Sequence, residues 1–338
     1  MPIGGAVPPG GTRVEGIIIR RSSSSLSVDT GSGVLTCVQR GKMRMEAPCV
    51  AGDRVRVLVT GPGAGILDEV LPRQSELRRG GLTGETDGKV AAANIDLVVL
   101  VQSAASPAPR WALMDRLLVE AAHEGLESLL VVNKIDLVEA GSPEREELEA
   151  ALSIYRGVGV PCLTTSVIVP DRLDEFRALL KGRVSVFSGH SGVGKTSLIN
   201  SLVPGSGLET GEVNPVTGKG RHTTSSAVLI AMGGGGHVMD TPGFREFALT
   251  GISPPDLGRY YPEFQEAIAG CRFRDCLHRG EPGCILVRRV EEGAISKLRY
   301  QNYLQILRTL VEKGPENPSR RSAGRGSTPP SEWMRPKS

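Results

Sequence analysis

The chain has 338 residues with 40 basic and 37 acidic side chains, so its net charge is only +3. The charge is segregated: residues 12–80 carry 11 Lys/Arg against 7 Asp/Glu, 81–270 carry 15 against 23, and 271–338 carry 14 against 7. Separate modules explain this pattern better than one uniform body. No apolar run approaches the roughly 18 residues of a membrane span, and 13 aromatic residues argue against a platform that stacks single-stranded bases.

The N-terminal residues and the number of cysteines indicate the cellular compartment of the protein. Residues 1–11 are rich in Gly and Pro, lack the basic-then-apolar pattern of a secretory signal, and are expected to form a flexible tail. Six cysteines are too few for a disulfide scaffold. We therefore expect a cytoplasmic protein with no membrane association.

Short strand-like runs come first in the chain, separated by Gly, Ser and Pro turns. They lie at Arg13–Arg20, Gly33–Gln39 and Asp53–Thr60. Short strands at this spacing predict a small barrel of about five strands, which we bound at residues 12–80.

Alternating strands and helices follow over residues 81–250. Strand-like runs are found at Ile95–Val101, Leu129–Val132, Cys162–Thr165, Val184–Phe187, Ala227–Ile230 and His237–Met239. Apolar residues at helical spacing predict a helix over Arg110–His123, and Ser142 is a good N-cap for an acidic helix through Ile154. The alternation predicts a doubly wound, mostly parallel α/β sheet.

The last part of the chain is predicted to be helical and then disordered. Residues 251–314 form a helical domain whose final helix has apolar residues at helical spacing from Tyr303 to Val311. Gly314-Pro315 ends that helix. Residues 315–338 are rich in Pro, Ser, Arg and Gly, which predicts a disordered basic tail.

A phosphate-binding motif lies after the strand-like run Val184–Phe187. The template GxxxxGK[ST] is matched by Gly189, His190, Ser191, Gly192, Val193, Gly194, Lys195 and Thr196, and Ser197 continues into a predicted helix. Backbone N–H groups and the helix N-terminus would bind phosphate oxygens. Lys195 would contact the β- and γ-phosphates and Thr196 would bind Mg²⁺, whereas His190 has no assigned role. The alternative is a Gly-rich turn that binds nothing.

Two further motifs complete a guanine-nucleotide site. In the DxxG motif, Asp240 would hold Mg²⁺ through water, and the Gly243 N–H would bond the γ-phosphate. In the NKxD motif, Asn133 and Lys134 would brace the loop and cover the base. The Asp136 carboxylate can accept hydrogen bonds from guanine N1–H and the exocyclic amine, which adenine cannot donate, so it would be unpaired against adenine.

The loop at Ser166 is a further candidate contact to the guanine base. The backbone at Ser166-Val167, after the run Cys162–Thr165, can donate an N–H to guanine O6. Any single NKxD match can instead be an ordinary surface turn.

The order of these motifs indicates circular permutation. NKxD and Ser166 precede the P-loop, and Asp240 comes last, whereas a Ras-like GTPase begins with the P-loop. In a circular permutation the original ends of the domain are joined and new ends arise elsewhere in the chain. The sheet can stay intact because the termini of a domain usually lie close together. The chain after Asp240 then runs directly into the C-terminal domain.

A metal knuckle lies within fourteen residues of the C-terminal domain. Its ligands are Cys271, Cys276, His278 and Cys284. Three thiolates and an imidazole suit tetrahedral Zn²⁺, and a full shell indicates a structural site. The alternative is a set of unpaired buried thiols. Basic side chains surround the knuckle and make it a candidate RNA contact, or a solvated face: Arg272, Arg274, Arg279, Arg288 and Arg289.

Over residues 12–312 the chain resembles the RsgA (YjeQ) family of small-ribosomal-subunit-dependent GTPases. The resemblance rests on ANIDLVVLVQSA (93–104), LMDRLLVEA (113–121), NKIDL (133–137), GHSGVGKTSLIN (189–200), GKGRHTTS (218–225), DTPGFRE (240–246), CRFRDCLHRGEPGC (271–284), Cys37–Lys42 and Gly52–Val55. It implies an N-terminal OB-fold, a permuted GTPase domain and a C-terminal zinc domain. It further implies a monomer that acts late in small-subunit maturation. Val167 departs from the Ala usual in the guanine loop.

The remaining catalytic groups around the γ-phosphate are expected in two switch segments, one near Thr224 and one after the DxxG motif. Thr224 is the favoured switch residue that completes the Mg²⁺ shell, with Thr223 as the alternative. Phe244 stands where Ras-type enzymes have a water-orienting Gln, and a hydrophobic side chain cannot orient water. His222 is our hypothesis for that role, and the alternative is a histidine packed in a loop.

The leading interpretation is a GTP hydrolase, cycling between GTP and GDP, whose end domains bind ribosomal RNA and whose activity rises on the small subunit. Lys195 and Mg²⁺ would stabilise charge on the transferred phosphoryl group. The missing Gln keeps open a GTP-sensing, RNA-binding adaptor with negligible turnover. A permuted GTPase of the large subunit is a third possibility, and the barrel with the knuckle argues against it by family analogy.

Overall fold

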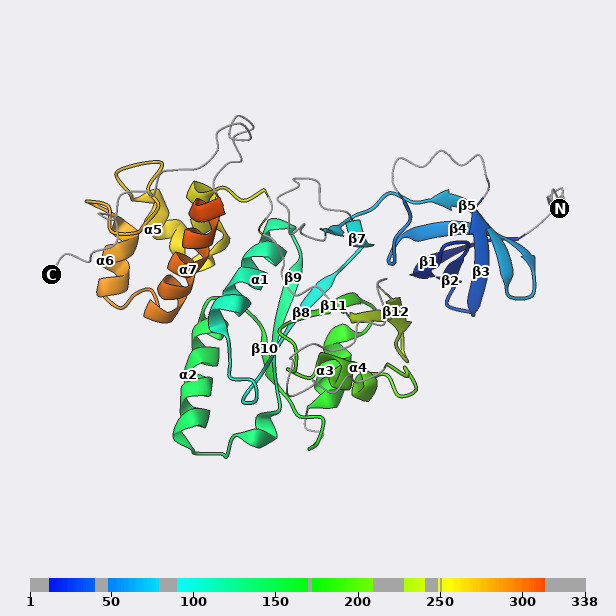
Figure 1. Cartoon of the computed structure of the whole chain (residues 1–338), viewed down its shortest axis with the longest axis horizontal. Helices are drawn as coiled ribbons and strands as arrows, with labels where there is room; N and C mark the ends of the chain where they lie inside the picture. Colours follow the sequence, from blue (N-terminus) through cyan, green and yellow to red (C-terminus); the bar gives the residue numbers. More distant parts are fainter. Residues whose placement is uncertain are drawn as a thin grey trace, which may run out of the picture.

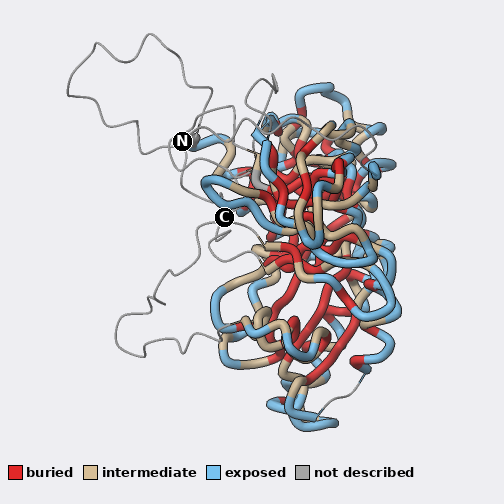
Figure 2. Tube along the Cα trace, turned by 90° about the vertical axis from the view of Figure 1, so that its right-hand side faces the viewer, coloured by how far each residue is buried: buried red, intermediate tan, exposed pale blue. Residues whose placement is uncertain are grey.

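The computed structural model describes residues 12–39, 48–78, 90–169, 172–208, 228–240, 249 and 251–313. Its elements form three bodies in a row: a β-barrel, a central sheet with helices, and a helical domain (Figure 1). Buried segments run through the middle of these bodies and exposed ones lie at the surface (Figure 2). Among the described residues, none of the helices has the length and apolar character needed to cross a bilayer.

The N-terminal barrel is of the OB type, as predicted. Its strands are β1 (Arg13–Arg21), β2 (Leu26–Asp29), β3 (Val34–Gln39), β4 (Arg54–Gly61) and β5 (Ala64–Val70). They close in the order β1-β2-β3-β5-β4, with β3 and β5 parallel and β4 paired back onto β1. Alternate side chains such as Ile18, Val28 and Val55 fill the interior. Strands β2 and β5 were not named from the sequence, because β2 has only four residues and Gly65 weakens the pattern of β5.

The central sheet has six strands in the order β10-β9-β8-β11-β13-β12. They are β8 (Leu97–Ser103), β9 (Glu127–Asn133), β10 (Cys162–Thr164), β11 (Val184–Ser188), β12 (Val228–Ala231) and β13 (His237–Asp240). All neighbours are parallel except β12, which pairs antiparallel with β13 at the edge. The mostly parallel sheet is therefore confirmed.

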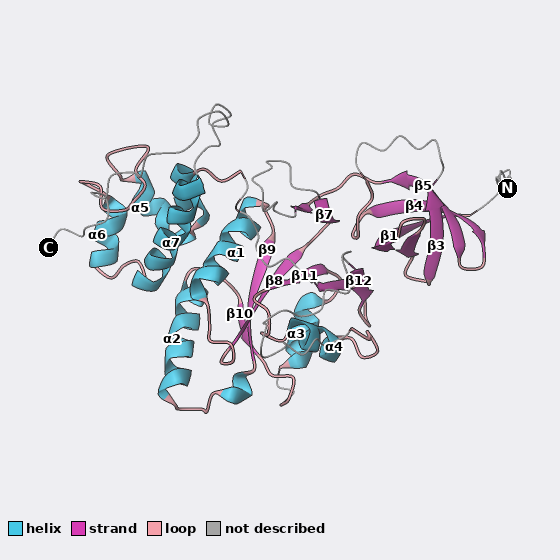
Figure 3. Ribbon diagram, viewed as in Figure 1, coloured by secondary structure: helices cyan, strands magenta, loops and turns pink. Residues whose placement is uncertain are grey.

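Helices cover both faces of this sheet (Figure 3). On one face α1 (Trp111–His123) and α2 (Pro143–Gly157) pack on Val98 and Leu100 of β8. On the other, α3 (Leu173–Leu180) and α4 (Lys195–Leu202) pack on Val99 of the same strand. Because β8 is buried on both faces, it is apolar without alternation. A 3₁₀ turn, η1 (Ile135–Leu137), follows β9.

The C-terminal domain is helical and contains η2 (Pro254–Tyr260), η3 (Pro262–Phe264), α5 (Gln265–Ala269), α6 (Ile285–Glu291) and α7 (Lys297–Lys313). Its core is built on three aromatic rings. The Tyr261 and Phe264 ring centroids lie 4.6 Å apart, and Tyr303 meets both edge-on at 5.5 and 5.3 Å. Val119 of α1 belongs to the same core, so this domain is packed onto the central one.

A buried charged network joins α7 to α1. Arg299 contacts the Asp115 carboxylate, and Asn302 Nδ2 donates to the other Asp115 oxygen at 2.8 Å. Arg299 Nε also donates to Glu263 Oε1 at 2.7 Å, and the guanidinium lies 4.5 Å from the Tyr261 ring centroid. Arg299 is 2% exposed and Asp115 is 0% exposed. The contact between the two domains is therefore specific and dry.

A hydrogen-bonded joint connects the barrel to the central domain. Strand β6 (Glu76–Arg78) pairs with β7 (Val90–Ala93), and Ala93 N donates to Ala51 O at 3.0 Å. Gly52 has φ +95°, and a Cβ there would lie 1.9 Å from Ala93 O, so only glycine allows this approach. Asn94 Nδ2 donates to Gly52 O at 2.9 Å.

An ion pair and a histidine–carboxylate contact strengthen the barrel side. Arg73 makes a bidentate contact with the buried Asp53 carboxylate at 2.7 and 3.0 Å. His237 Nε2, at the start of β13, lies 2.9 Å from Asp29 Oδ2 at the end of β2. The barrel therefore touches the central sheet at a strand that also leads to the nucleotide motifs.

Glu120 is an unusual buried acid on α1. Its side chain lines a small pocket with Leu77, Val98 and Leu126, and its Oε2 has no hydrogen-bond partner among the described residues. Burial raises the pKa of Glu120 to about 9; Arg116 lowers it and Glu124 raises it by smaller amounts. The folded state therefore holds this carboxyl in its neutral form at pH 7.

Glu120→Gln should stabilise the fold above about pH 5. The folded-state pKa is raised, so the wild type loses stability as pH rises from about 4.5 toward 9, because only the unfolded state ionises there. Glutamine removes that dependence and should gain about 1–3 kcal/mol at pH 7, measured as the free energy of unfolding in urea. Glu147→Gln, at an exposed position of α2, is the control. A wild-type pH profile parallel to that of Glu120→Gln would contradict the assignment.

Candidate nucleotide site and metal centre

The P-loop lies at the point where the strand order reverses. From β8 the chain builds outward through β9 and β10, and then returns to β11 on the other side of β8. Ligands of open α/β sheets bind at this crevice, outside the carboxyl ends of the strands. The loop after β11 occupies it and leads into α4, which begins at Lys195.

Two glycines of the loop are required by close approaches. Gly189 has φ +148°, and a Cβ there would lie 2.0 Å from Val101 O. Gly194 has φ +92°, and a Cβ there would lie 2.3 Å from Asn133 Nδ2. Larger residues at either position would push the loop away from β8 or from the NKxD loop. These glycines therefore place the phosphate loop against the base-binding loop.

The charged and hydroxyl groups predicted for the phosphates meet in the structure. Lys195 Nζ donates to Gly189 O at 2.9 Å and to His190 O at 3.0 Å, so the amine lies against its own loop. Thr196 Oγ1 donates to Asp240 Oδ2 at 2.7 Å. The other oxygen, Asp240 Oδ1, is buried with no partner among the described residues. A hydroxyl beside an unsatisfied carboxylate oxygen is a donor set that suits Mg²⁺.

The NKxD loop is tied to the P-loop by two side chains. Asn133 is fully buried, and its Nδ2 donates to Val193 O at 2.9 Å. Lys134 has left-handed backbone geometry with φ +59°. Its Nζ donates to Ser106 O at 2.6 Å and to Gly192 O at 2.7 Å. These bonds hold the base and phosphate loops in one arrangement.

Ser166 orients Asp136. The Ser166 hydroxyl donates to Asp136 Oδ1 and accepts from the N–H groups of Ile168 and Val169, both at 3.1 Å. Ser166 is fully buried, whereas Asp136 is exposed at the carboxyl edge of the sheet. The side chain of Ser166 thus has a positioning contact that differs from the backbone role expected from the sequence.

Several expected residues cannot be placed. His222, Thr223, Thr224, Gly243 and Phe244 lie outside the described residues, in the segments 209–227 and 241–248. The P-loop residues Ser191 and Ser197 are described and lie with the rest of the motif.

The loop after β8 also shapes the site, although it was not predicted from the sequence. Ser103 Oγ donates to Pro107 O at 2.6 Å, and Gln102 Oε1 accepts from Arg110 N at 3.2 Å. These two side chains shape the loop that presents Ser106 O to Lys134. The available signal was the change from apolar to polar at the end of the run IDLVVLVQS, where parallel strands place ligand-binding loops.

The four predicted metal ligands come together in the C-terminal domain. The ligand atoms of Cys271, Cys276, His278 and Cys284 all lie within 4.8 Å of one another. His278 Nδ1 is 3.6 Å from Cys271 Sγ and 3.5 Å from Cys284 Sγ, and the two sulfurs are 4.0 Å apart. Tetrahedral Zn–S and Zn–N bonds of about 2.3 and 2.05 Å give edges of roughly 3.5–3.8 Å. The cluster can therefore hold a metal ion.

Two thiols of the cluster are buried, and the turn between the ligands is fixed by hydrogen bonds. Burial raises the pKa of Cys276 to about 12 and also raises the pKa of Cys284. Such thiols stay protonated unless a metal stabilises the thiolate. Glu281 accepts from the N–H groups of Leu277 at 2.9 Å and Arg279 at 2.7 Å, which fixes the turn between the ligands.

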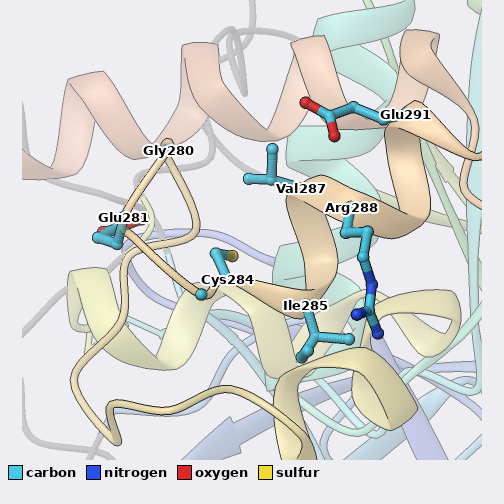
Figure 4. Close-up of a pocket in the computed structure, with 8 residues that line it drawn as sticks. Gly280, Glu281, Cys284, Ile285, Val287, Arg288 and Glu291 are labelled. Carbon is cyan, nitrogen blue, oxygen red and sulfur yellow. The ribbon is translucent and has the colours of Figure 1, made fainter.

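A separate pocket of about 330 Å³ lies beside the cluster (Figure 4). Cys284 lines it together with Arg288, Glu281 and Glu291. Two carboxylates against one guanidinium do not favour an anionic ligand. We assign this pocket no part in nucleotide binding.

Comparison with known proteins agrees with this geometry. The family model described as RsgA GTPase matches residues 70–250, more than half of the chain. The chain belongs to the RsgA GTPase family. The "Small ribosomal subunit biogenesis GTPase RsgA" of Moorella thermoacetica is 39% identical over 301 residues, covering 89% of this chain and 98% of the relative. The protein of the same name from Pseudomonas aeruginosa is 40% identical over 303 residues, covering 89% and 87%.

Two solved structures resemble the whole arrangement. YjeQ from Thermotoga maritima superposes with a TM-score of 0.73 and 31% identity, covering 89% of this chain and 99% of that one. YloQ, described as a circularly permuted GTPase, gives 0.72 and 28% identity, covering 93% and 100%. Barrel, permuted P-loop domain and Cys/His-bearing helical domain therefore form the architecture expected from the sequence.

Proposed function

We propose that this chain hydrolyses GTP and acts as a maturation factor of the small ribosomal subunit. The observation that carries the proposal is the convergence of three motifs on one edge of the sheet. Lys134 bridges to Gly192 of the P-loop, Ser166 orients Asp136, and Thr196 bonds Asp240. The names of the relatives supply the ribosomal role.

The proposed chemistry divides between a base end and a phosphate end. Asp136 accepts from guanine N1–H and the exocyclic amine, with Ser166 holding the carboxylate in position. The P-loop N–H groups, with that of Gly243, surround the phosphates, and Lys195 moves from its loop carbonyls to the β- and γ-oxygens. Thr196 and Asp240 would hold Mg²⁺, directly and through water. Mg²⁺, when bound, neutralises charge that builds on the phosphate oxygens.

The water-orienting and switch residues belong to this proposal. Thr224, or Thr223, completes the Mg²⁺ shell, and His222 orients the attacking water in place of a Gln. His222→Ala should lower subunit-stimulated turnover while GTP affinity stays within about twofold. Unchanged stimulated turnover would exclude His222.

The ends of the molecule complete the proposal. The Cys/His cluster holds one structural Zn²⁺, which metal analysis of the purified protein measures directly; far less than one zinc per chain would overturn it. The barrel, bounded at residues 12–80, and the zinc domain at 251–314 contact ribosomal RNA on either side of the GTPase domain at 81–250. The family resemblance favours a monomer, and the ribosomal role favours the cytoplasm, where ribosomal subunits mature.

Asp136→Asn should change the base preference from guanine to xanthine. The asparagine oxygen still accepts from N1–H, but its amide opposes the exocyclic amine of guanine and instead suits the C2 carbonyl of xanthine. The Kd for GDP should rise roughly 30- to 200-fold, and XDP should become the tighter ligand. Fluorescent-nucleotide titration checks both. Glu139→Gln on the same loop is the control, and unchanged preference would contradict the assignment.

One experiment tests the function against its rivals. GTP turnover is measured for the chain alone, with purified small subunits, and with purified large subunits. Stimulation by the small subunit alone is expected. Negligible turnover under all conditions, together with GTP-dependent subunit binding, would favour the adaptor. Stimulation by the large subunit would indicate that the chain is a GTPase of the large subunit instead.

A further inference from the structure

Phe273 is the exception among the described phenylalanines. Phe176, Phe187 and Phe264 are fully buried, whereas Phe273 is 45% exposed. It lies in the loop between Cys271 and Cys276, where residues 272–275 are all exposed. One exposed apolar side chain is ordinary by itself, so its surroundings decide what it can do.

One guanidinium lies against this ring, and two more belong to the same knuckle. The Arg272 guanidinium lies 5.3 Å from the Phe273 ring centroid, within cation–π range. Arg274 and Arg279 lie on the same knuckle and are exposed. In the part of the chain that the structure describes, none of these three guanidiniums has an ion-pair partner. An exposed aromatic ring flanked by unpaired arginines suits a ligand with both a π-face and negative charge.

The loop that carries the ring is short and held at both ends. Cys271 and Cys276 belong to the metal cluster, Cys271 N donates to Ile268 O at 3.1 Å, and Cys276 N donates to Phe273 O at 3.4 Å. Because both anchors are fixed, Phe273 would lose little conformational entropy when it binds. Its exposure is therefore a property of a constrained loop.

We propose that Phe273 stacks on an unpaired base of ribosomal RNA, with Arg272 against the ring and Arg274 and Arg279 on the flanking phosphates. The inference rests on the proposed function and adds the kind of RNA that the zinc domain binds. Base–aromatic stacking needs a base that is already out of a helix, because paired bases bury their faces. Bound RNA at this knuckle is thus single-stranded or bulged. A single stacking residue differs from the multi-aromatic platform that the low aromatic content argues against.

The test separates stacking from a general apolar contact. Phe273→Leu keeps an apolar side chain without a π-face, Phe273→Trp keeps the π-face, and Phe273→Ala removes both. Kd values are measured on the full chain for purified small subunits and for a single-stranded oligoadenylate of about 12 nucleotides. The Leu and Ala variants should each weaken binding about 5- to 100-fold, and the Trp variant should retain it.

A spectroscopic arm reports the stack itself. The chain has two tryptophans, Trp111 and Trp333. Phe273→Trp is therefore made in a Trp333→Phe background, and the remaining emission of Trp111 is subtracted by measuring that background alone. Emission from the introduced tryptophan should be quenched by the single-stranded oligonucleotide and not by a duplex of the same length. Zinc content and subunit-free GTP turnover should match the wild type, which verifies folding.

The outcomes separate this inference from the proposed function. Wild-type affinity in Phe273→Leu would mean an apolar protein contact, and wild-type affinity in Phe273→Ala would mean no contact; either overturns stacking. Absence of quenching also overturns it. If the wild type binds the oligonucleotide through Phe273 but no subunit binds or stimulates it, stacking stands and the ribosomal function fails.

Discussion

Lys195→Ala should lower the rate of GTP turnover by about 10²- to 10³-fold on the small subunit. In the proposed mechanism this lysine contacts the β- and γ-phosphate oxygens, so its loss should remove a donor to charge that develops in the transition state. The amine lies against Gly189 O and His190 O and so is already inside the loop. Single-turnover hydrolysis with saturating subunits measures the effect on the chemical step.

Two variants bracket this expectation. Lys181→Ala removes the same charge from an exposed site after α3 and should leave turnover unchanged. Lys195→Arg keeps the charge but not the compact ammonium, and should also slow GTP turnover strongly. If Lys195→Ala retained more than a tenth of the wild-type rate at saturating GTP, Lys195 would not be the catalytic cation.

Arg299→Met should destabilise the chain by about 3–5 kcal/mol. The substitution leaves the buried Asp115 and the partly buried Glu263 without their shared cation, and breaking one side of a buried ion pair costs this much. Because Asp115 is on α1 and Arg299 is on α7, the loss should fall on the contact between the central and C-terminal domains. Denaturant unfolding with two probes, tyrosine absorbance and nucleotide binding, measures it.

The control for Arg299 lies on the same helix. Arg308→Met removes an exposed arginine from α7 and should change stability by less than about 0.5 kcal/mol. The double variant Asp115→Asn/Arg299→Met should recover part of the loss, because it removes one of the stranded charges. Equal effects of Arg299→Met and Arg308→Met would contradict a structural role for the network.

Motif residues were predictable from the sequence because local backbone geometry fixes them. Gly189, Gly194 and Lys195 belong to one strand–loop–helix unit, so their spacing alone specifies a cradle for phosphate. The Cys/His cluster was predictable for a related reason, since four ligands of one ion must be within a few ångströms. Both signals depend on short-range chemistry.

The contacts between domains were not predictable in this way. Asp115 and Arg299 are 184 residues apart, and nothing in an amphipathic helix shows which distant side chain will meet it. The Lys134 bond to Ser106 O depends on a tertiary approach of two loops to the same edge of the sheet. Such pairs follow from topology, which periodicity alone does not give.

The structure shows which part of the barrel sequence carries its excess of basic residues. The described barrel residues from 12 to 78 carry seven basic and six acidic side chains. Arg13 pairs with Asp68, and Arg56 pairs with Glu15 and Glu69. The excess of basic residues comes from segment 40–47 and Arg79, outside the described residues. If the barrel binds RNA by charge, we expect that segment to contribute most of its salt dependence.

Strand β13 connects the barrel to the P-loop over a fixed distance. His237 at its first residue contacts Asp29 of the barrel, and Asp240 at its last contacts Thr196. Three residue steps of extended chain span about 10 Å and do not stretch. A barrel that shifts when it meets RNA would therefore pull on the same strand that sets the position of the Asp240 carboxylate. We expect the timing of hydrolysis to depend on how the barrel is seated, with no contact between RNA and nucleotide.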